Sequence, residues 1–187
     1  SGLSALYEDD SDSKEEKNDK DSDDKEKSQA KEPAKQSGEL GKTWDSYTVQ
    51  INDKVLTLPC TLAELESAGV TLDREYTPED YVVVEMVNMT DKPIALKDCV
   101  VGGISVDAYS VEEGGLTVIF PGGIQIGSTE ADVLAAYGEP SDTYESEEYG
   151  NSFTWFNENS ENYYDGCSID TELETGLVDS MSLTHYE

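Results

Sequence analysis

The second half of this chain has no positive charge. Residues 98–187 contain no Lys or Arg, against nineteen Asp and Glu, and the chain of 187 residues has a formal net charge of −30. Nucleic-acid phosphates and anionic lipid headgroups are bound through a surplus of Lys and Arg. The composition therefore excludes nucleic acid and an anionic membrane surface as partners, and it is compatible with cationic ones.

Residue types that bind metals or catalyse reactions are also scarce. The sequence has a single His, His185, and it has no C-x-x-C pair or other zinc-ligand spacing. A G-x-S-x-G nucleophile elbow, an EF-hand calcium loop and a glycine-rich phosphate loop are all absent. We therefore predict a protein that is not an enzyme and has no metal and no cofactor, with His185 on a solvent-exposed strand edge.

The three cysteines, Cys60, Cys99 and Cys167, cannot all pair within one chain, so at most one internal disulfide forms. Cys60 is expected at the start of a helix, where the helix dipole lowers a thiol pKa. At that position Cys60 could have a redox role, or it could simply be a small residue beside the helix cap. A bridge between Cys60 and Cys99 stays open, and otherwise Cys99 and Cys167 are expected to be buried thiols.

Residues 1–42 differ in kind from the rest. Residues 8–36 contain no aromatic or β-branched side chain, so this segment buries too little apolar surface to offset the entropy of ordering. We predict a disordered acidic stalk that resembles the spacers of bacterial surface proteins. A signal or anchor is expected upstream of Ser1, and because no run of about 18 apolar residues follows, membrane contact is expected only through that anchor.

Residues 43–110 begin with a hairpin and a helix. Residues 47–51 and 55–58 alternate apolar and polar side chains around the turn at residues 52–54, which predicts a β-hairpin. Thr61 and Glu64 have the spacing of a capping box, and Gly69 suits the end of a helix of about two turns. The apolar side of this helix is predicted to contain Leu62, Leu65 and Ala68.

The same pattern returns in residues 111–187. Residues 116–120 and 124–126 predict a second hairpin, and Thr129 with Asp132 predicts a second capping box before Pro140 ends the helix. Residues 124–133 align with residues 56–65 with two identities and five conservative matches. This alignment indicates an internal duplication, although hairpin-helix units also share caps and turns for physical reasons alone.

Each helix is followed by segments typical of strands. Three strands are predicted in the first copy, at residues 81–87, 94–101 and 104–109, and three in the second, at residues 152–156, 163–170 and 177–186. Strand alternation assigns one face to the core side chains Phe153, Trp155, Cys167, Ile169, Met181 and Leu183. The predicted fold is therefore α+β: two tandem hairpin-helix-three-strand-meander repeats, residues 43–110 and 111–187, after the stalk.

The motif I-x-I-G-x-T-x-x-D-V-x-x-x-Y-G-x-P at residues 124–140 resembles the repeat of small bacterial lipoproteins of the outer-membrane-assembly (SmpA/OmlA) type. It is also similar to the tandem domains of β-lactamase inhibitory proteins. The matching residues are Gly127, Thr129, Asp132, Val133, Tyr137, Gly138 and Pro140. The resemblance covers residues 115–187 well and residues 45–110 loosely, where Pro59 replaces the glycine. It implies two helix-on-sheet units that act through protein contacts without catalysis.

Aromatic side chains on the other sheet face are the candidate binding residues. Phe156, Tyr164 and Tyr186 share that face, and Tyr144, Tyr149 and Tyr163 lie in nearby loops or edges. Rings surrounded by acids are typical of binding faces, because rings bury much area at little entropic cost. The alternative is that the other copy covers this face.

We therefore expect a non-catalytic, extracellular binding module, anchored to a bacterial cell envelope. Its expected partner is another protein or a cell-wall polymer. Two alternatives from other classes stay open. One is a hydrolase that uses a carboxylate pair, and the other is a structural spacer stiffened by calcium, with oxygen-rich turns at residues 142–148 and 157–162.

Overall fold

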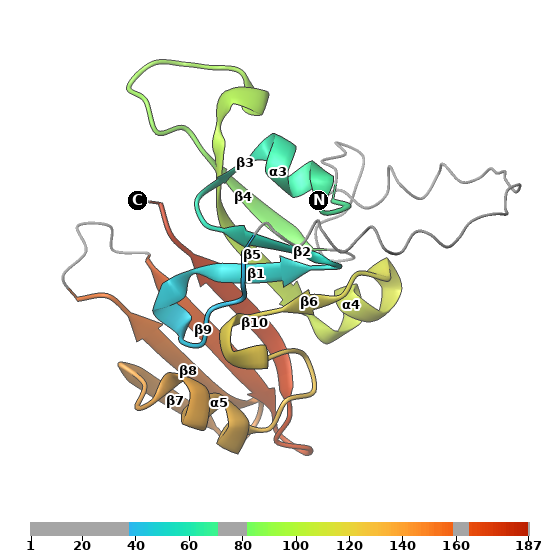
Figure 1. Cartoon of the computed structure of the whole chain (residues 1–187). Helices are drawn as coiled ribbons and strands as arrows, with labels where there is room; N and C mark the ends of the chain where they lie inside the picture. The colour runs from blue at the N-terminus through green and yellow to red at the C-terminus, as the bar shows by residue number, and fades with distance from the viewer. Residues whose placement is uncertain (1–37, 71–81, 159–164, 187) are drawn as a thin grey trace, which may run out of the picture.

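The computed structural model describes residues 38–70, 82–158 and 165–186 (Figure 1). Most of the predicted stalk, residues 1–37, lies outside the described residues. Its last part joins the fold, because the Gly41 N–H donates to Thr48 Oγ1 at 2.8 Å and the Gly41 carbonyl accepts from the Gly122 N–H at 2.8 Å. None of the described helices has the length and apolar character needed to cross a membrane.

The elements alternate short helices with antiparallel strands. The first half contains η3 (Trp44–Ser46), β1 (Thr48–Ile51), β2 (Lys54–Thr57), β3 (Cys60–Thr61), α3 (Leu62–Ser67), β4 (Val83–Val87), η5 (Leu96–Asp98) and β5 (Val100–Asp107). The second half contains α4 (Ala108–Gly114), β6 (Val118–Ile119), η6 (Pro121–Gly123), α5 (Glu130–Tyr137), β7 (Asp142–Ser146), β8 (Gly150–Phe156), β9 (Gly166–Glu172) and β10 (Val178–Thr184).

The strands form two antiparallel sheets, which confirms the predicted α+β class. The larger sheet has seven strands in the order β3-β5-β10-β9-β8-β7, with β4 also paired to β5. The smaller sheet has three strands in the order β2-β1-β6. Pairing of β5 with β10 joins the two halves of the chain in one sheet, and pairing of β1 with β6 joins them again in the other.

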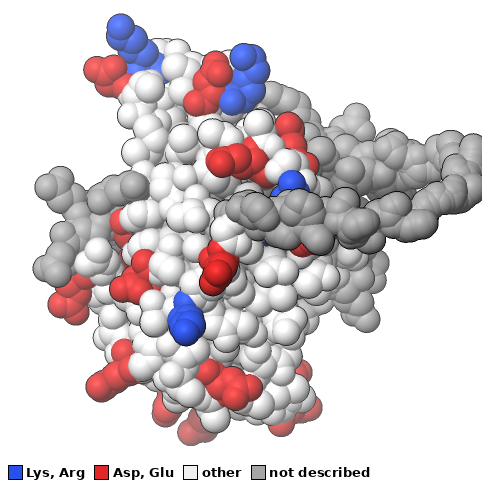
Figure 2. Space-filling model, viewed as in Figure 1, with Lys and Arg blue, Asp and Glu red and all other residues white. Residues whose placement is uncertain are grey.

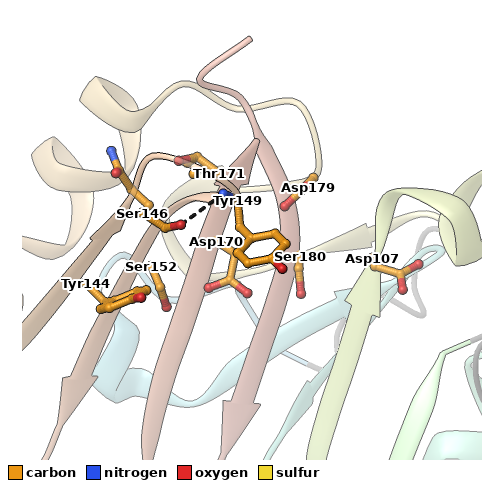
Figure 3. Close-up of a pocket in the computed structure, with 11 residues that line it drawn as sticks. Asp107, Tyr144, Ser146, Tyr149, Ser152, Asp170, Thr171, Asp179 and Ser180 are labelled. Atoms are coloured by element: carbon orange, nitrogen blue, oxygen red, sulfur yellow. Dashed lines mark hydrogen bonds between the residues drawn. The ribbon is translucent and has the colours of Figure 1, made fainter. Parts of the chain in front are cut away.

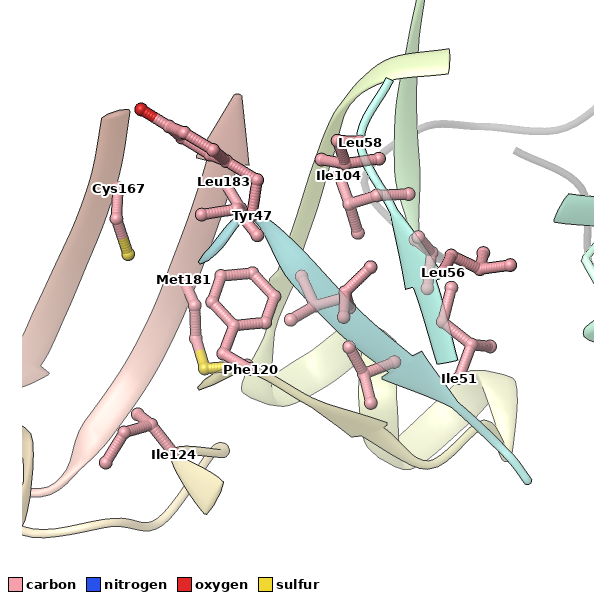
Figure 4. Packing of buried hydrophobic residues seen from close by; sticks show 14 of the residues in the cluster. Tyr47, Ile51, Leu56, Leu58, Ile104, Phe120, Ile124, Cys167, Met181 and Leu183 are labelled. Atoms are coloured by element: carbon pink, nitrogen blue, oxygen red, sulfur yellow. The ribbon is translucent and has the colours of Figure 1, made fainter. Parts of the chain in front are cut away.

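The core lies on one face of the large sheet, which we call the inner face. The small sheet and α3 lie on one part of this face and α5 on another (Figure 1). Phe120 from the small-sheet side lies beside Met181 of β10 (Figure 4), and Ile51 and Leu183 belong to the same apolar cluster. The predicted core residues Phe153, Trp155, Cys167, Ile169, Met181 and Leu183 are all buried on this face.

The first hairpin and helix form as the sequence predicts. β1 and β2 pair around a two-residue turn that begins at Asn52, whose φ is +57°. Thr61 Oγ1 accepts from the Glu64 N–H, and the Glu64 carboxylate accepts from the Thr61 N–H, so both halves of the capping box are present. Leu65 is fully buried beneath α3, which ends before Gly69 with its φ of +106°.

The predicted three-strand meander of the first half is wrong. Residues 94–98 form a loop with the short η5, and a single strand, β5, runs through Gly102 and Gly103 where we predicted a break. Gly102 allows close approach of a ring, since a Cβ there would lie 2.8 Å from the Tyr186 ring, and Gly103 lies beside the flexible Glu85 side chain, whose Oε1 would be 2.9 Å from a Cβ. The chain then enters α4, capped reciprocally by Asp107 and Ser110, in a region predicted as strand.

The second half also departs from the predicted repeat. Residues 116–126 form no hairpin, since β6 pairs with β1 and a single bridge joins Phe120 to Ile124. The cap of α5 has only the bond from the Asp132 N–H to Thr129 Oγ1, without the reciprocal bond of a full capping box. The predicted acidic turn at residues 142–148 begins with strand β7, so the second meander has four strands.

Charge is unevenly distributed over the molecule. In Figure 2 the blue side chains lie at the upper end and the centre of the visible face, whereas the lower end shows only Asp and Glu. The lower end contains α5 and β7 (Figure 1), which belong to the half without Lys or Arg. The absence of Lys and Arg from the second half of the sequence therefore also leaves one end of the visible face without positive charge.

Candidate binding face

The other face of the large sheet, which we call the outer face, lies opposite the small sheet, α3 and α5 (Figure 1), and α4 borders it where Ser110 lies near Ser105 and Ser180. The strand register aligns Tyr144, Ser152, Asp170, Ser180 and Asp107 in one row across five strands. The next two rows contain Asp142, Thr154, Ser168, Ser182 and Ser105, then Phe156, Gly166, Thr184, Gly103 and Glu85. The outer face is therefore a surface of small hydroxyl groups and carboxylates with rings at its margin.

Two of the predicted tyrosines meet at a hollow on this face. The hollow has a volume of about 450 Å³ and includes Tyr144, Tyr149, Asp107, Asp170 and Asp179 among its lining residues. Tyr144 is 67% exposed and Tyr149 is 76% exposed. Figure 3 shows the Tyr149 ring lying over the sheet beside Asp170 and Ser180. We call this the Tyr149 hollow.

The turn between β7 and β8 fixes the position of Tyr149. Ser146 Oγ accepts from the backbone N–H groups of Glu148 and Tyr149, each at 3.0 Å. Gly150 follows with a φ of +108°, and a Cβ there would lie 2.1 Å from the Thr171 carbonyl oxygen. Only glycine therefore fits at this position, and the tight turn carries the Tyr149 ring back over the sheet.

A β-bulge adds a third carboxylate to the hollow. Val178 pairs with Thr171 and Ser180 pairs with Asp170, so Asp179 has no partner in the register. Its side chain lines the Tyr149 hollow together with Asp170. Burial raises the pKa of the Asp179 carboxyl, and the neighbouring carboxylates of Asp170, Glu172 and Asp107 raise it further, against a lowering by a backbone hydrogen bond.

Phe156 lies at a second hollow of about 330 Å³ on the same face. The residues around it include Thr154, Ser168, Ser182 and Thr184, which occupy the rows next to those of the Tyr149 hollow. Phe156 is the last residue of β8, its ring lies on the outer face, and it is 38% exposed. The predicted site residue Phe156 therefore belongs to the outer face and not to the Tyr149 hollow.

Tyr186 lies apart from the other rings. Its ring lies against Gly102 of β5, and its hydroxyl donates to Glu85 of β4. Glu85 belongs to β4, which pairs with β5 at the opposite end of the sheet from β7. Tyr186 therefore lies at the end of the outer face farthest from β7. The remaining two predicted site residues, Tyr163 and Tyr164, lie outside the described residues.

His185 is not at a solvent-exposed edge, contrary to our prediction. Its ring stacks on Tyr47 with centroids 3.9 Å apart, and its Nδ1 lies 3.2 Å from Oδ2 of Asp165. Asp165 is buried and also accepts from the Tyr186 N–H at 3.0 Å. This cluster ties the end of β10 to the start of β9 on the inner side of the sheet.

The cysteines are free thiols, so no bridge joins Cys60 and Cys99. Cys60 is buried in β3, directly before Thr61, the N-cap of α3, and burial, followed by the charge of Glu64, raises its thiol pKa to about 12. The expected lowering by the helix dipole is therefore outweighed. Burial likewise raises the pKa of the Cys167 thiol, whereas Cys99 is only half-buried.

Within the described parts of the chain, no group of three or more His, Cys, Asp and Glu side chains is placed to hold a metal ion. The carboxylates of the outer face are thus neighbours without the close geometry of metal ligands. Comparison of the chain with protein-family models, with curated proteins and with solved structures gives no match.

Strand alternation in the sequence predicts Ser168, Ser182 and Thr184 on the face opposite the core, and the structure confirms this. Ser168 and Asp170 alternate with core residues along β9, and Ser180, Ser182 and Thr184 do so along β10. Alternation alone therefore predicts these side chains on one face. Asp179 had no such signal, because simple alternation places it on the opposite face and only the bulge brings it to the hollow.

Proposed function

We propose that this chain is a non-catalytic binding module that contacts another protein through the outer face. The observation that carries this proposal is the asymmetry of the seven-stranded sheet. Its inner face is covered by the small sheet, α3 and α5, whereas its outer face bears two neighbouring hollows and exposed rings. Exposed tyrosines beside polar hollows are typical of protein interfaces.

The size of the outer face favours a macromolecule over a small ligand. Six strands spaced at about 4.8 Å extend over about 24 Å, and strands of seven residues are about 23 Å long, so the sheet offers about 550 Å². One partner in a standard protein interface contributes about 800 Å². Adding the projecting turn with Tyr149 brings the face to the size of a modest protein interface.

A location outside a bacterial cell, with an anchor upstream of the chain, is part of the same proposal. It is supported by the acidic composition of residues 1–37 and by the resemblance of residues 124–140 to small envelope lipoproteins. The finer fold proposal is that the chain contains two related helix-on-sheet units. α3 beside β5 and α5 beside β8 support it, whereas the strands that follow each helix differ.

A hydrolase remains the second candidate, because one observation favours it. The pKa of Asp179 is raised beside Asp170, as the pKa of a general acid is beside a second carboxylate. Both side chains lie on an open sheet face rather than in a closed cleft. Release of nitrophenol from a panel of nitrophenyl glycosides by the wild type, and its loss in Asp179→Asn, would favour the hydrolase over the binding module.

The binding proposal is tested by photo-crosslinking in the envelope fraction of the cells that make this protein. A benzophenone amino acid replaces Tyr144 on the outer face or, as a control, Leu96, which is 44% exposed in η5. We expect one protein band from the Tyr144 position, lost when Tyr149 and Phe156 are also changed to Ala. Equal crosslinking from both positions, or crosslinking only to glycan, would contradict the proposal.

A further inference from the structure

The Tyr149 hollow brings together three carboxylates without compensating charge. Asp170 and Asp107 stand in one row with one strand, β10, between them, which places their strands about 10 Å apart. Asp179 lies on the intervening strand at the bulge. All three line the same hollow, but the Asp107 carboxylate accepts from the Ser110 N–H at 2.7 Å as the cap of α4. Asp170 and Asp179 are therefore the two carboxylates that a positive group in the hollow would pair with.

The protein supplies no such positive group from the strands around the hollow. The face is built by β5, β7, β8, β9 and β10, all of which lie in residues 98–187 and hence contain no Lys or Arg. The remaining strand on this face, β4, contributes Val83 and Glu85. The described strands of the sheet therefore supply no countercharge for these carboxylates, and a positive group of a partner is complementary to them.

The rings decide which kind of positive group fits. Tyr149 lies over the sheet beside Asp170, with Tyr144 at the near margin of the hollow (Figure 3). A metal ion gains little from two aromatic rings, and the carboxylates lack the close geometry of metal ligands. A guanidinium group is planar, stacks on aromatic faces and presents five N–H donors, whereas an ammonium group is a compact, strongly hydrated charge.

We propose that the partner inserts an arginine side chain into the Tyr149 hollow. The guanidinium group lies against the Tyr149 ring and pairs with the carboxylates of Asp170 and Asp179, while the hydroxyls of Ser152 and Ser180 accept its remaining N–H donors. The volume of about 450 Å³ is ample for one such side chain with neighbouring atoms of the partner. This proposal rests on the function proposed above and names the chemistry of its partner.

The test uses short peptides as probes of the hollow. The full chain, labelled with ¹⁵N, is titrated at physiological ionic strength with acetyl-Gly-Gly-Arg-Gly-Gly-amide. Matched peptides have Lys or the neutral isostere citrulline in place of Arg. We expect saturable shifts of the amides of Tyr149, Asp170 and Ser180, about fivefold weaker binding of the Lys peptide, and no saturation with citrulline.

Charge-matched variants show whether the hollow is responsible. In Asp170→Asn with Asp179→Asn, we expect at least tenfold weaker binding of the Arg peptide. In Asp45→Asn with Asp53→Asn, which removes the same charge from the opposite side of the sheet, we expect a change below twofold. Tyr149→Ala is expected to weaken binding about fivefold. Equal binding by both double variants, or shifts confined to residues 1–37, would overturn the proposal.

The two proposals fail in different ways. If crosslinking from the Tyr144 position persists in Asp170→Asn with Asp179→Asn and the Arg peptide does not bind, the outer face binds a protein but not through arginine. If the Arg peptide binds the hollow and the Tyr144 position gives no protein crosslink, the arginine site stands and the proposed function falls.

Discussion

The two faces of the large sheet are built from the same strands and differ in almost every property. Along β9, Cys167 and Ile169 face inward and are buried, while Ser168 and Asp170 between them face outward and are half-buried. The inner side chains are apolar and support the fold, whereas the outer ones are too small and polar to add much to stability. We infer that stability and binding are assigned to alternate residues of the same strands.

The largest difference between the faces is expected at two neighbours on β8. Trp155 is 2% exposed, its ring meets Tyr137 edge-on at 5.2 Å, and its Nε1–H donates to the Gly138 carbonyl. Trp155→Ala should lower the free energy of unfolding by about 3–5 kcal/mol. Thr154→Ala, on the outer face, should change it by less than about 0.5 kcal/mol. Urea unfolding measures both free energies, and a similar loss in the two variants would contradict the proposed difference between the faces.

A smaller difference is expected between two carboxylates. Asp165 is buried, with the His185 ring and the Tyr186 N–H as partners, whereas Asp170 lies half-buried on the outer face. Asp165→Asn should cost about 2 kcal/mol, because hydrogen bonds to a charged group are lost or weakened. Asp170→Asn should leave thermal stability unchanged or slightly higher. Calorimetry compares the two, and an equal loss in Asp170→Asn would assign the outer carboxylates a structural role.

The smallest effect is expected at Asp179, and it depends on pH. Because the folded-state pKa is raised above 3.8, ionisation of Asp179 opposes folding. Stability is lost as pH rises from the unfolded-state pKa through the higher folded-state value. Asp179→Asn should therefore raise the free energy of unfolding at neutral pH by less than about 1 kcal/mol, and urea unfolding should show this gain vanish well below pH 3.8.

The control for this prediction is Asp53→Asn, which removes one charge from the exposed β1–β2 turn, away from the outer face. A gain of the same size and pH dependence in the control would indicate a general effect of net charge. A loss of stability in Asp179→Asn at neutral pH would show that this carboxylate stabilises the bulge instead of opposing its neighbours.

Several local signals predicted the fold correctly, although the Asp107–Ser110 cap of α4 is also a local signal and was missed. The Thr61–Glu64 capping box, the β1–β2 hairpin and the inward residues of β8, β9 and β10 were all predicted correctly. Other failures occurred where a distant segment decides the structure. Gly102 and Gly103 were interpreted as a break, yet both lie inside a continuous strand, where Gly102 allows the close approach of the Tyr186 ring.

The candidate site was predicted only in part for the same reason. Tyr144, Tyr149 and Phe156 were predicted as exposed rings and lie on or beside the outer face. That Tyr144 and Tyr149 share a hollow with Asp107 and Asp170 follows from the register of five strands. Register depends on pairings between segments far apart in the sequence, and alternation within one strand carries no information about them.

The sequence by itself determined the absence of Lys and Arg after residue 97, the helix caps and the alternation that separates core from surface, because each depends on residue type and near neighbours. Tertiary structure alone decided that β5 pairs with β10 and joins both halves in one sheet. It also decided that a bulge turns Asp179 to the outer face. Long-range pairing sets the register, and the register decides which side chains become neighbours.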